Sequence, residues 1–99
     1  MITLKLVLKK KWYDMIDSGE KPEEYRDITE YWTVRLHPYI QLLEHGEQIA
    51  VRFYCGYRLN RPHMEFLIDG IGSGEGNPEW GAEPGKKYFV INLGERLTA

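Results

Sequence analysis

The chain has 99 residues, which fits one small domain (residues 1–99) with a modest core. Its 13 Lys and Arg against 15 Asp and Glu give a net charge of −2, which excludes nucleic-acid binding through overall positive charge alone but allows a local basic groove. The single cysteine excludes an internal disulfide and a multi-cysteine zinc site. No apolar run has the length of a signal peptide or a membrane span, so we expect a cytoplasmic protein without a membrane partner.

The N-terminal segment predicts a strand followed by a helix. Apolar residues alternate with polar ones along the strand, at Ile2, Leu4, Leu6 and Leu8. From about residue 10 to residue 18 the apolar period becomes helical, and Gly19 stands where a helix C-cap tolerates positive φ. The lysines at positions 9–11 oppose the helix dipole, so they are either a solvated surface or a phosphate contact beside a helix N-terminus.

The central segment predicts two strands with short helical pieces between them. A strand is expected from Pro22 to about Ile28, and a short helical or irregular piece from Thr29 to about Leu36. Pro38 is expected to end that piece, and residues 39–45 add a further turn. The clearest strand is Gln48–Arg58.

The two faces of this clearest strand differ in character. One is apolar and comprises Ile49, Val51, Phe53, Cys55 and Tyr57. This placement predicts a buried, inert thiol at Cys55. Arg52, Tyr54 and Arg58 lie on the other face, with Arg61 nearby. They form either a basic, aromatic strip for nucleic acid or the solvated outer face of a half-buried strand.

The C-terminal third predicts two more strands around a long loop. Strands are expected over His63–Ile71 and Lys87–Leu93, and residues 70–85 are rich in Gly, Pro and acidic residues. A loop of roughly fifteen residues is uncommon in a small domain and is often functional. Trp80 lies in it and either stacks on a bound base or anchors the loop to the core. The element order predicts an α+β fold, a small curled sheet or open barrel of about five to six strands with one or two helices.

One spacing carries most of the chemical information. Glu24 and Arg26 are two residues apart on a predicted strand and therefore share a face, just after Gly19 and Lys21. Inside a barrel mouth such an acid–base pair can bind a polar ligand. On the outside it is a surface ion pair that contributes less than about 1 kcal/mol.

The spacing Gly-x-Lys-x-x-Glu-x-Arg resembles the signature motif of the ASCH family, in the PUA-like superfamily, and this chain fills all four positions. The strand and helix before the motif, and the apolar closing strand that ends in Leu93-Gly94, are also similar to that family. The resemblance covers essentially the whole chain. It implies a PUA-like mixed β-barrel whose cleft, lined by Lys21, Glu24 and Arg26, binds RNA or a modified nucleobase.

One branch of that family is catalytic and deacylates N4-acetylcytidine. There the motif lysine acts with a threonine three residues later and with a distant glutamate. Lys21 matches the lysine, but Glu24 stands at the threonine position and removes the hydroxyl. The distant glutamate has three candidates in the loop, Glu75, Glu79 and Glu83. This departure favours binding over that particular catalysis.

The leading hypothesis is therefore a non-catalytic module for RNA or a nucleotide-like small molecule, with the 70–85 loop as a flap. The candidate ligand-binding residues are Lys21, Glu24, Arg26, Arg52, Tyr54 and Trp80. One alternative is a small amidohydrolase acting on a modified nucleoside, with Lys21 and Glu24 as catalytic residues. A second is a protein-interaction domain whose motif is only a structural ion pair. The scattered histidines predict no metal site, and no cofactor motif is recognised.

Overall fold

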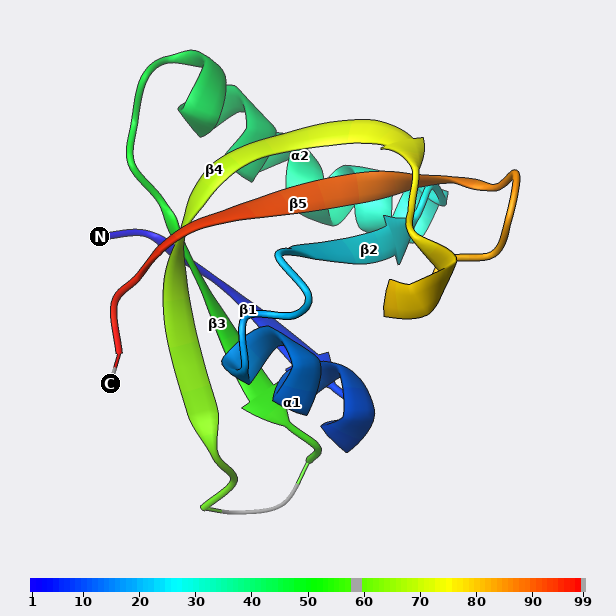
Figure 1. The fold of residues 1–99 in the computed structure, drawn as a ribbon. Helices are drawn as coiled ribbons and strands as arrows, with labels where there is room; N and C mark the ends of the chain where they lie inside the picture. Colours follow the sequence, from blue (N-terminus) through cyan, green and yellow to red (C-terminus); the bar gives the residue numbers. More distant parts are fainter. Residues whose placement is uncertain (58–59, 99) are drawn as a thin grey trace.

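The structure is a computed structural model that describes residues 1–57 and 60–98. The N-terminal half contains β1 (Thr3–Leu8), α1 (Lys10–Asp17), β2 (Glu23–Asp27) and α2 (Glu30–Glu44). The C-terminal half contains β3 (Ala50–Cys55), β4 (His63–Glu75), the 3-10 turn η1 (Pro78–Trp80) and β5 (Lys87–Arg96). Figure 1 shows the strands wrapping into a curled sheet with the two helices beside it.

The strands form one mixed sheet in the order β1-β3-β4-β5-β2. β1 pairs with β3 in parallel, and the other three pairs are antiparallel. The sheet curls into a half-barrel whose two edge strands are β1 and β2 (Figure 1). The predicted α+β class, the curled sheet and the two helices are thus confirmed for the residues that the structure describes.

The main core lies where the periodicities predicted it. The fully buried side chains come from both helices, from β3, β4 and β5, and from the residue just before β3: Ile16, Leu36, Ile49, Val51, Phe53, Met64 and Ile91. Leu4, Leu6 and Leu8 join this cluster from β1, as their alternation indicated. A smaller cluster of Tyr25, Ala82 and Tyr88 lies where the chain after η1 packs against β2 and β5.

The prediction that Pro38 ends a helix is wrong. α2 runs without interruption from Glu30 to Glu44 and contains Pro38. Its start is fixed by the Thr29 side chain, which accepts a hydrogen bond from Trp32 N at 3.2 Å. Leu36 is fully buried, so burial of the helix's apolar side chains offsets the hydrogen bond that proline cannot make.

The prediction of a loop from residue 70 to residue 85 is only half right. β4 continues to Glu75, with Ile71 opposite Ile91 and Glu75 opposite Lys87. Glycine weakens a strand but does not prevent one when a partner strand supplies the ladder. β5 is correspondingly longer than predicted and reaches Arg96. The non-strand connection is therefore limited to residues 76–86 and contains η1.

The predicted strand 48–58 also differs at its ends. β3 spans Ala50–Cys55, and Cys55 is half-buried rather than buried. Tyr57, which was expected on the apolar face, lies beyond the strand and is 85% exposed. The prediction for Arg58 falls outside the described residues. Among the described helices, none is long and apolar enough to cross a membrane.

Candidate functional site

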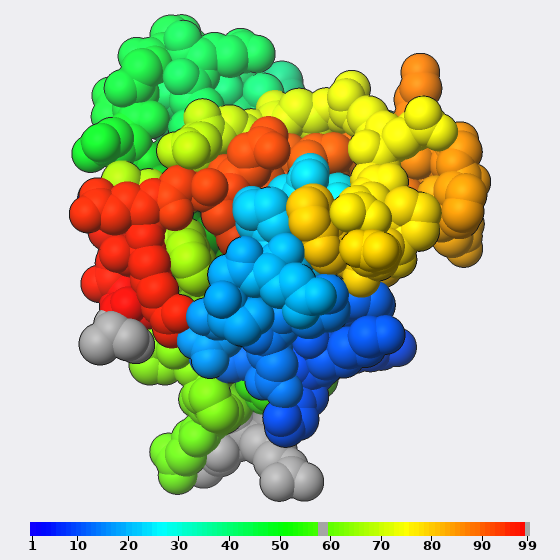
Figure 2. Space-filling model, in the orientation of Figure 1, coloured from blue at the N-terminus to red at the C-terminus, as the bar shows by residue number. Residues whose placement is uncertain are grey.

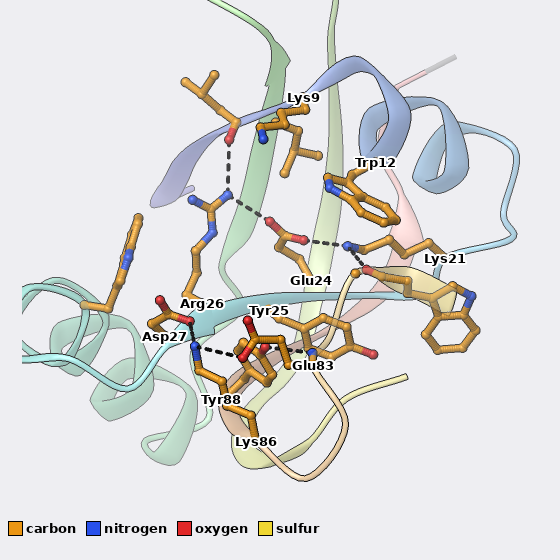
Figure 3. A pocket seen from close by; sticks show the side chains of 15 residues that line it. Lys9, Trp12, Lys21, Glu24, Tyr25, Arg26, Asp27, Glu83, Lys86 and Tyr88 are labelled. Carbon is orange, nitrogen blue, oxygen red and sulfur yellow. Dashed lines mark hydrogen bonds and ion pairs between the residues drawn. The ribbon is translucent and has the colours of Figure 1, made fainter. Parts of the chain in front are cut away.

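A pocket of about 540 Å³ opens between the two edge strands of the half-barrel. Its walls come from β1, α1, β2, the first turn of α2, η1 with the segment after it, and the start of β5 (Figure 3). It is lined by Val7, Leu8, Lys9, Trp12, Lys21, Glu24, Tyr25, Arg26, Asp27, Trp32, Trp80, Gly81, Glu83, Lys86 and Tyr88. Figure 2 shows the η1 segment, in gold, lying against the chain that follows α1, in light blue. We call this the seam pocket.

Glu24 stands at the centre of the seam pocket and pairs with two cations. Its Oε1 accepts a hydrogen bond from Lys21 Nζ at 2.8 Å, and its Oε2 accepts one from Arg26 Nη2 at 2.8 Å (Figure 3). Glu24 is only 6% exposed and Lys21 only 2%. Charges removed from water to this degree are costly unless paired, so each cation and the shared carboxylate compensate one another.

Lys21 ties the motif to the loop that follows β4. Its Nζ also donates to the carbonyl oxygen of Trp80 at 2.9 Å. The ammonium lies over two aromatic rings, 4.9 Å from the centroid of Trp12 and 5.2 Å from that of Tyr25. These four contacts all stabilise a charged ammonium. Lys21 therefore holds α1, β2 and the η1 segment together at one point.

Arg26 spans the gap between the edge strands. Carbonyl oxygens of Ile2 and Leu8 accept from the β3 side, so the alternation of the strand points Val7 O towards the open edge. Arg26 Nη2 donates to this Val7 oxygen at 3.2 Å. The guanidinium lies 4.8 Å from the ring centroid of Trp32. Its buried Nε has no acceptor among the described residues.

Two tyrosine hydroxyls fix the loop that forms one wall of the pocket. The Tyr25 hydroxyl accepts from Asn77 N at 2.9 Å, and the Tyr88 hydroxyl accepts from Glu83 N at 2.9 Å. Burial raises the pKa of Tyr25, with a smaller opposing effect from the Asn77 hydrogen bond. Gly81 has φ +100°, and a Cβ there would stand 2.9 Å from the Trp12 ring. Only glycine permits this close approach.

The outer rim of the seam pocket carries both signs of charge. Lys86 Nζ lies 3.1 Å from Asp27 Oδ1 and 4.0 Å from Glu83 Oε2. The hydrogen bond to Asp27 raises the pKa of Lys86. Lys9 also lines the pocket and makes no ion pair with another described residue. Of the lysines at positions 9–11, Lys9 is the one that lines the seam pocket.

The structure brings together four of the six predicted binding residues: Lys21, Glu24, Arg26 and Trp80. Arg52 and Tyr54 do not line the seam pocket. Arg52 pairs with Glu65 at 2.8 Å and donates to the Tyr54 hydroxyl at 3.2 Å. That hydrogen bond lowers the pKa of Tyr54.

The loop residues also divide between the pocket and the rest of the surface. Among the three predicted distant glutamates, only Glu83 lines the pocket. Trp80 is half-buried, packs against the smaller cluster and lines the pocket. Trp80 therefore anchors the loop to the smaller cluster and also forms part of the pocket wall.

Four aromatic residues that line the pocket were not among the predicted binding residues, namely Trp12, Tyr25, Trp32 and Tyr88. The sequence did contain a signal for Trp12. The helix that carries Trp12 is joined to the motif by a tight turn, so side chains of the helix can lie against side chains of the motif. No group of three metal-ligating side chains occurs among the described residues.

Comparisons with models of protein families, with curated proteins and with solved structures found no match to this chain.

Proposed function

We propose that the seam pocket binds the base and phosphate or sugar of a nucleotide, free or as one unit of RNA. The observation that carries this proposal is the combination of aromatic walls with an unsatisfied arginine. Trp12, Trp32 and Trp80 line the pocket together with Arg26, whose buried Nε has no acceptor among the described residues. Aromatic faces stack on bases, and arginine donates to phosphate or carbonyl oxygens. A volume of about 540 Å³ lies within the usual range for small-molecule sites.

The resemblance to the ASCH family adds a consistent argument. Gly19–Arg26 lies at the seam of a half-barrel, and an ASCH domain with a PUA-like barrel has its cleft next to this motif. We propose on this basis that the chain is a PUA-like binding module. The ligand class that follows from the resemblance is RNA or a modified nucleobase.

The role we assign to Lys21 and Glu24 is positioning. Both side chains are nearly inaccessible, and each is engaged by the other. Their pairing holds Arg26 and the Trp80 segment in place, while Arg26 and the aromatic rings contact the ligand. The amidohydrolase branch described above pairs its lysine with a threonine hydroxyl, but here the Lys21 ammonium is paired with Glu24, which supplies no hydroxyl. These contacts support binding over hydrolysis.

The test measures binding of the four ribonucleoside monophosphates and of short RNA by calorimetry or anisotropy. Arg26→Gln and Trp32→Leu should each weaken binding at least tenfold while circular dichroism shows a folded protein. Lys87→Gln, which removes an exposed cation outside the pocket, should leave binding within twofold. Absence of any nucleotide or RNA binding by the folded wild type would overturn the proposal. Turnover of N4-acylcytidines that disappears in Lys21→Ala would replace it with the hydrolase alternative.

A further inference from the structure

A second pocket adjoins the seam pocket along the open edge of β1. It has a volume of about 590 Å³ and lies between β1 and α2. Val7, Arg26 and Trp32 line both pockets and form the wall between them. The two pockets are therefore neighbours, and the guanidinium of Arg26 lies between them. We call the second pocket the edge pocket.

The edge pocket differs from the seam pocket in its charge. Lys5, Arg26 and Arg35 line it, and no acidic residue does so in the described part of the chain. Neither Lys5 nor Arg35 makes an ion pair with another described residue. The seam pocket, in contrast, includes Glu24, Asp27 and Glu83. A surface with uncompensated cations and no carboxylate favours a polyanion.

The edge pocket also presents aromatic faces and free backbone groups. Tyr31 is 55% exposed, and the Arg35 guanidinium lies 3.4 Å from its ring centroid, which holds the cation at the surface. Tyr39 and Tyr57 line other parts of the pocket. Because β1 is an edge strand, the N–H groups of alternate residues such as Lys5 point away from β3 and can donate to an anion.

We infer that the ligand is a single strand of RNA that occupies both pockets. One nucleotide lies in the seam pocket, and the phosphodiester and the neighbouring nucleotide lie in the edge pocket. This inference rests on the proposed function, because it extends the same site. Arg26 stands where the linking phosphate passes between the two pockets. Lys5 and Arg35 contact the next phosphate, and the tyrosines stack on its base.

An added peptide strand is the competing occupant of an edge strand. Arg26 already bonds to Val7 O, so one acceptor of that edge is taken. Strand addition draws its affinity from main-chain hydrogen bonds and does not require cations. The uncompensated cations favour the RNA strand, and an acidic peptide becomes an arm of the test.

The test compares the four ribonucleoside monophosphates with fluorescein-labelled hexaribonucleotides in the wild type and in Lys5→Gln/Arg35→Gln. The hexamer should bind at least tenfold tighter than the best monophosphate. The double variant should lose that advantage, keep its monophosphate affinity within twofold, and unfold at the wild-type denaturant midpoint. Because Lys5 and Arg35 contact one phosphate, removing both should reduce the slope of log affinity against log salt by about 0.7. Lys10→Gln/Lys87→Gln, with the same loss of charge outside both pockets, should behave as the wild type.

Four results would overturn the inference. Equal affinity for hexamer and monophosphate, or an unchanged hexamer affinity in the double variant, rejects the edge pocket and leaves the proposed function standing. If hexaglutamate displaces the labelled hexanucleotide at the same concentration as an unlabelled hexanucleotide does, the edge pocket is a site for acidic peptides instead. Absence of binding by any nucleotide probe removes the proposed function and the inference together.

Discussion

The Lys21 ammonium and the Glu24 carboxylate meet at 2.8 Å, and fewer than a tenth of either side chain's surface is exposed. The pair does not stand alone, because Glu24 also accepts from Arg26, which reaches the opposite edge strand at Val7 O. The sequence motif is therefore the connection that closes the open side of the half-barrel. The stability of the half-barrel and the shape of the seam pocket therefore depend on the same three charges, those of Lys21, Glu24 and Arg26.

Removing the central carboxylate should destabilise the fold strongly. Glu24→Ala leaves the Lys21 ammonium buried without its anion and should lower the free energy of unfolding by about 3–5 kcal/mol. Urea denaturation followed by tryptophan fluorescence measures this change. Glu83→Ala is the matched control, because Glu83 is exposed and its loss should stay within about 0.5 kcal/mol. Equal losses in the free energy of unfolding for the two substitutions would contradict the claim that Glu24 carries a buried charge that compensates Lys21.

Replacing both members of the buried pair should recover stability. Lys21→Met/Glu24→Leu removes the isolated charge and keeps much of the side-chain volume, so no unpaired ion remains beside Trp12. The double variant should regain at least half of the loss seen in Glu24→Ala. It should also bind nucleotides more weakly, because Arg26 loses its anchor. A double variant less stable than Glu24→Ala would show that packing, and not charge pairing, sets the cost.

Tyr25 should contribute to the alkaline limit of stability. Burial raises the pKa of Tyr25 above its ordinary value of 10.0, so the unfolded chain loses this proton first as pH rises. The stabilisation is complete below pH 10.0 and is lost as the pH rises through the folded-state pKa. The urea midpoint of the wild type should therefore decrease as the pH rises above 10, and the midpoint of Tyr25→Phe should decrease less steeply.

The same substitution has a second effect at neutral pH. Tyr25→Phe removes the acceptor of Asn77 N and should cost about 1 kcal/mol at pH 7. Tyr31→Phe, at an exposed tyrosine, is the control and should leave the neutral midpoint unchanged. An identical alkaline slope in wild type and Tyr25→Phe would assign the decline to other groups.

Two glycines at the end of β4 should differ sharply in their tolerance of alanine. A Cβ at Gly76 would lie 2.6 Å from the Ala82 Cβ and 2.7 Å from the Tyr25 ring, so Gly76→Ala displaces the loop wall. We expect a loss of about 1–3 kcal/mol and weaker ligand binding. Nothing lies within 4 Å of a Cβ at Gly74, and Gly74→Ala should be neutral or slightly stabilising. Thermal melts of both variants decide the question.

The start of α2 should depend on one side chain. Thr29 accepts from Trp32 N, so Thr29→Ala should cost about 1 kcal/mol. Because Trp32 separates the two pockets, the same change should weaken hexanucleotide binding. Thr33→Ala removes a hydroxyl that bonds only to the Thr29 carbonyl oxygen and should have little effect. Chemical denaturation and anisotropy measure the two quantities, and equal losses in both variants would argue against the cap.

Much of the local structure was predictable because it depends on near neighbours. The alternation of β1 and β3, the helical period of α1 and the placement of Glu24 and Arg26 on one strand face all follow from residues close in sequence. The failures came from distant partners. Pro38 remains inside α2 because Leu36 is buried against the core. Gly72 and Gly74 form strand because β5 lies beside them.

The sequence by itself determined the spacing that places a carboxylate between two cations, and the tendency of this segment to form a turn and a strand. Only the tertiary structure decided where that charged group lies. Curling of the sheet brings β1 opposite β2 and packs η1 over Lys21. The charged group, which by spacing alone could have been a surface ion pair, is thereby buried at the centre of a pocket. Burial depends on elements far apart in the chain, and a local pattern carries no information about them.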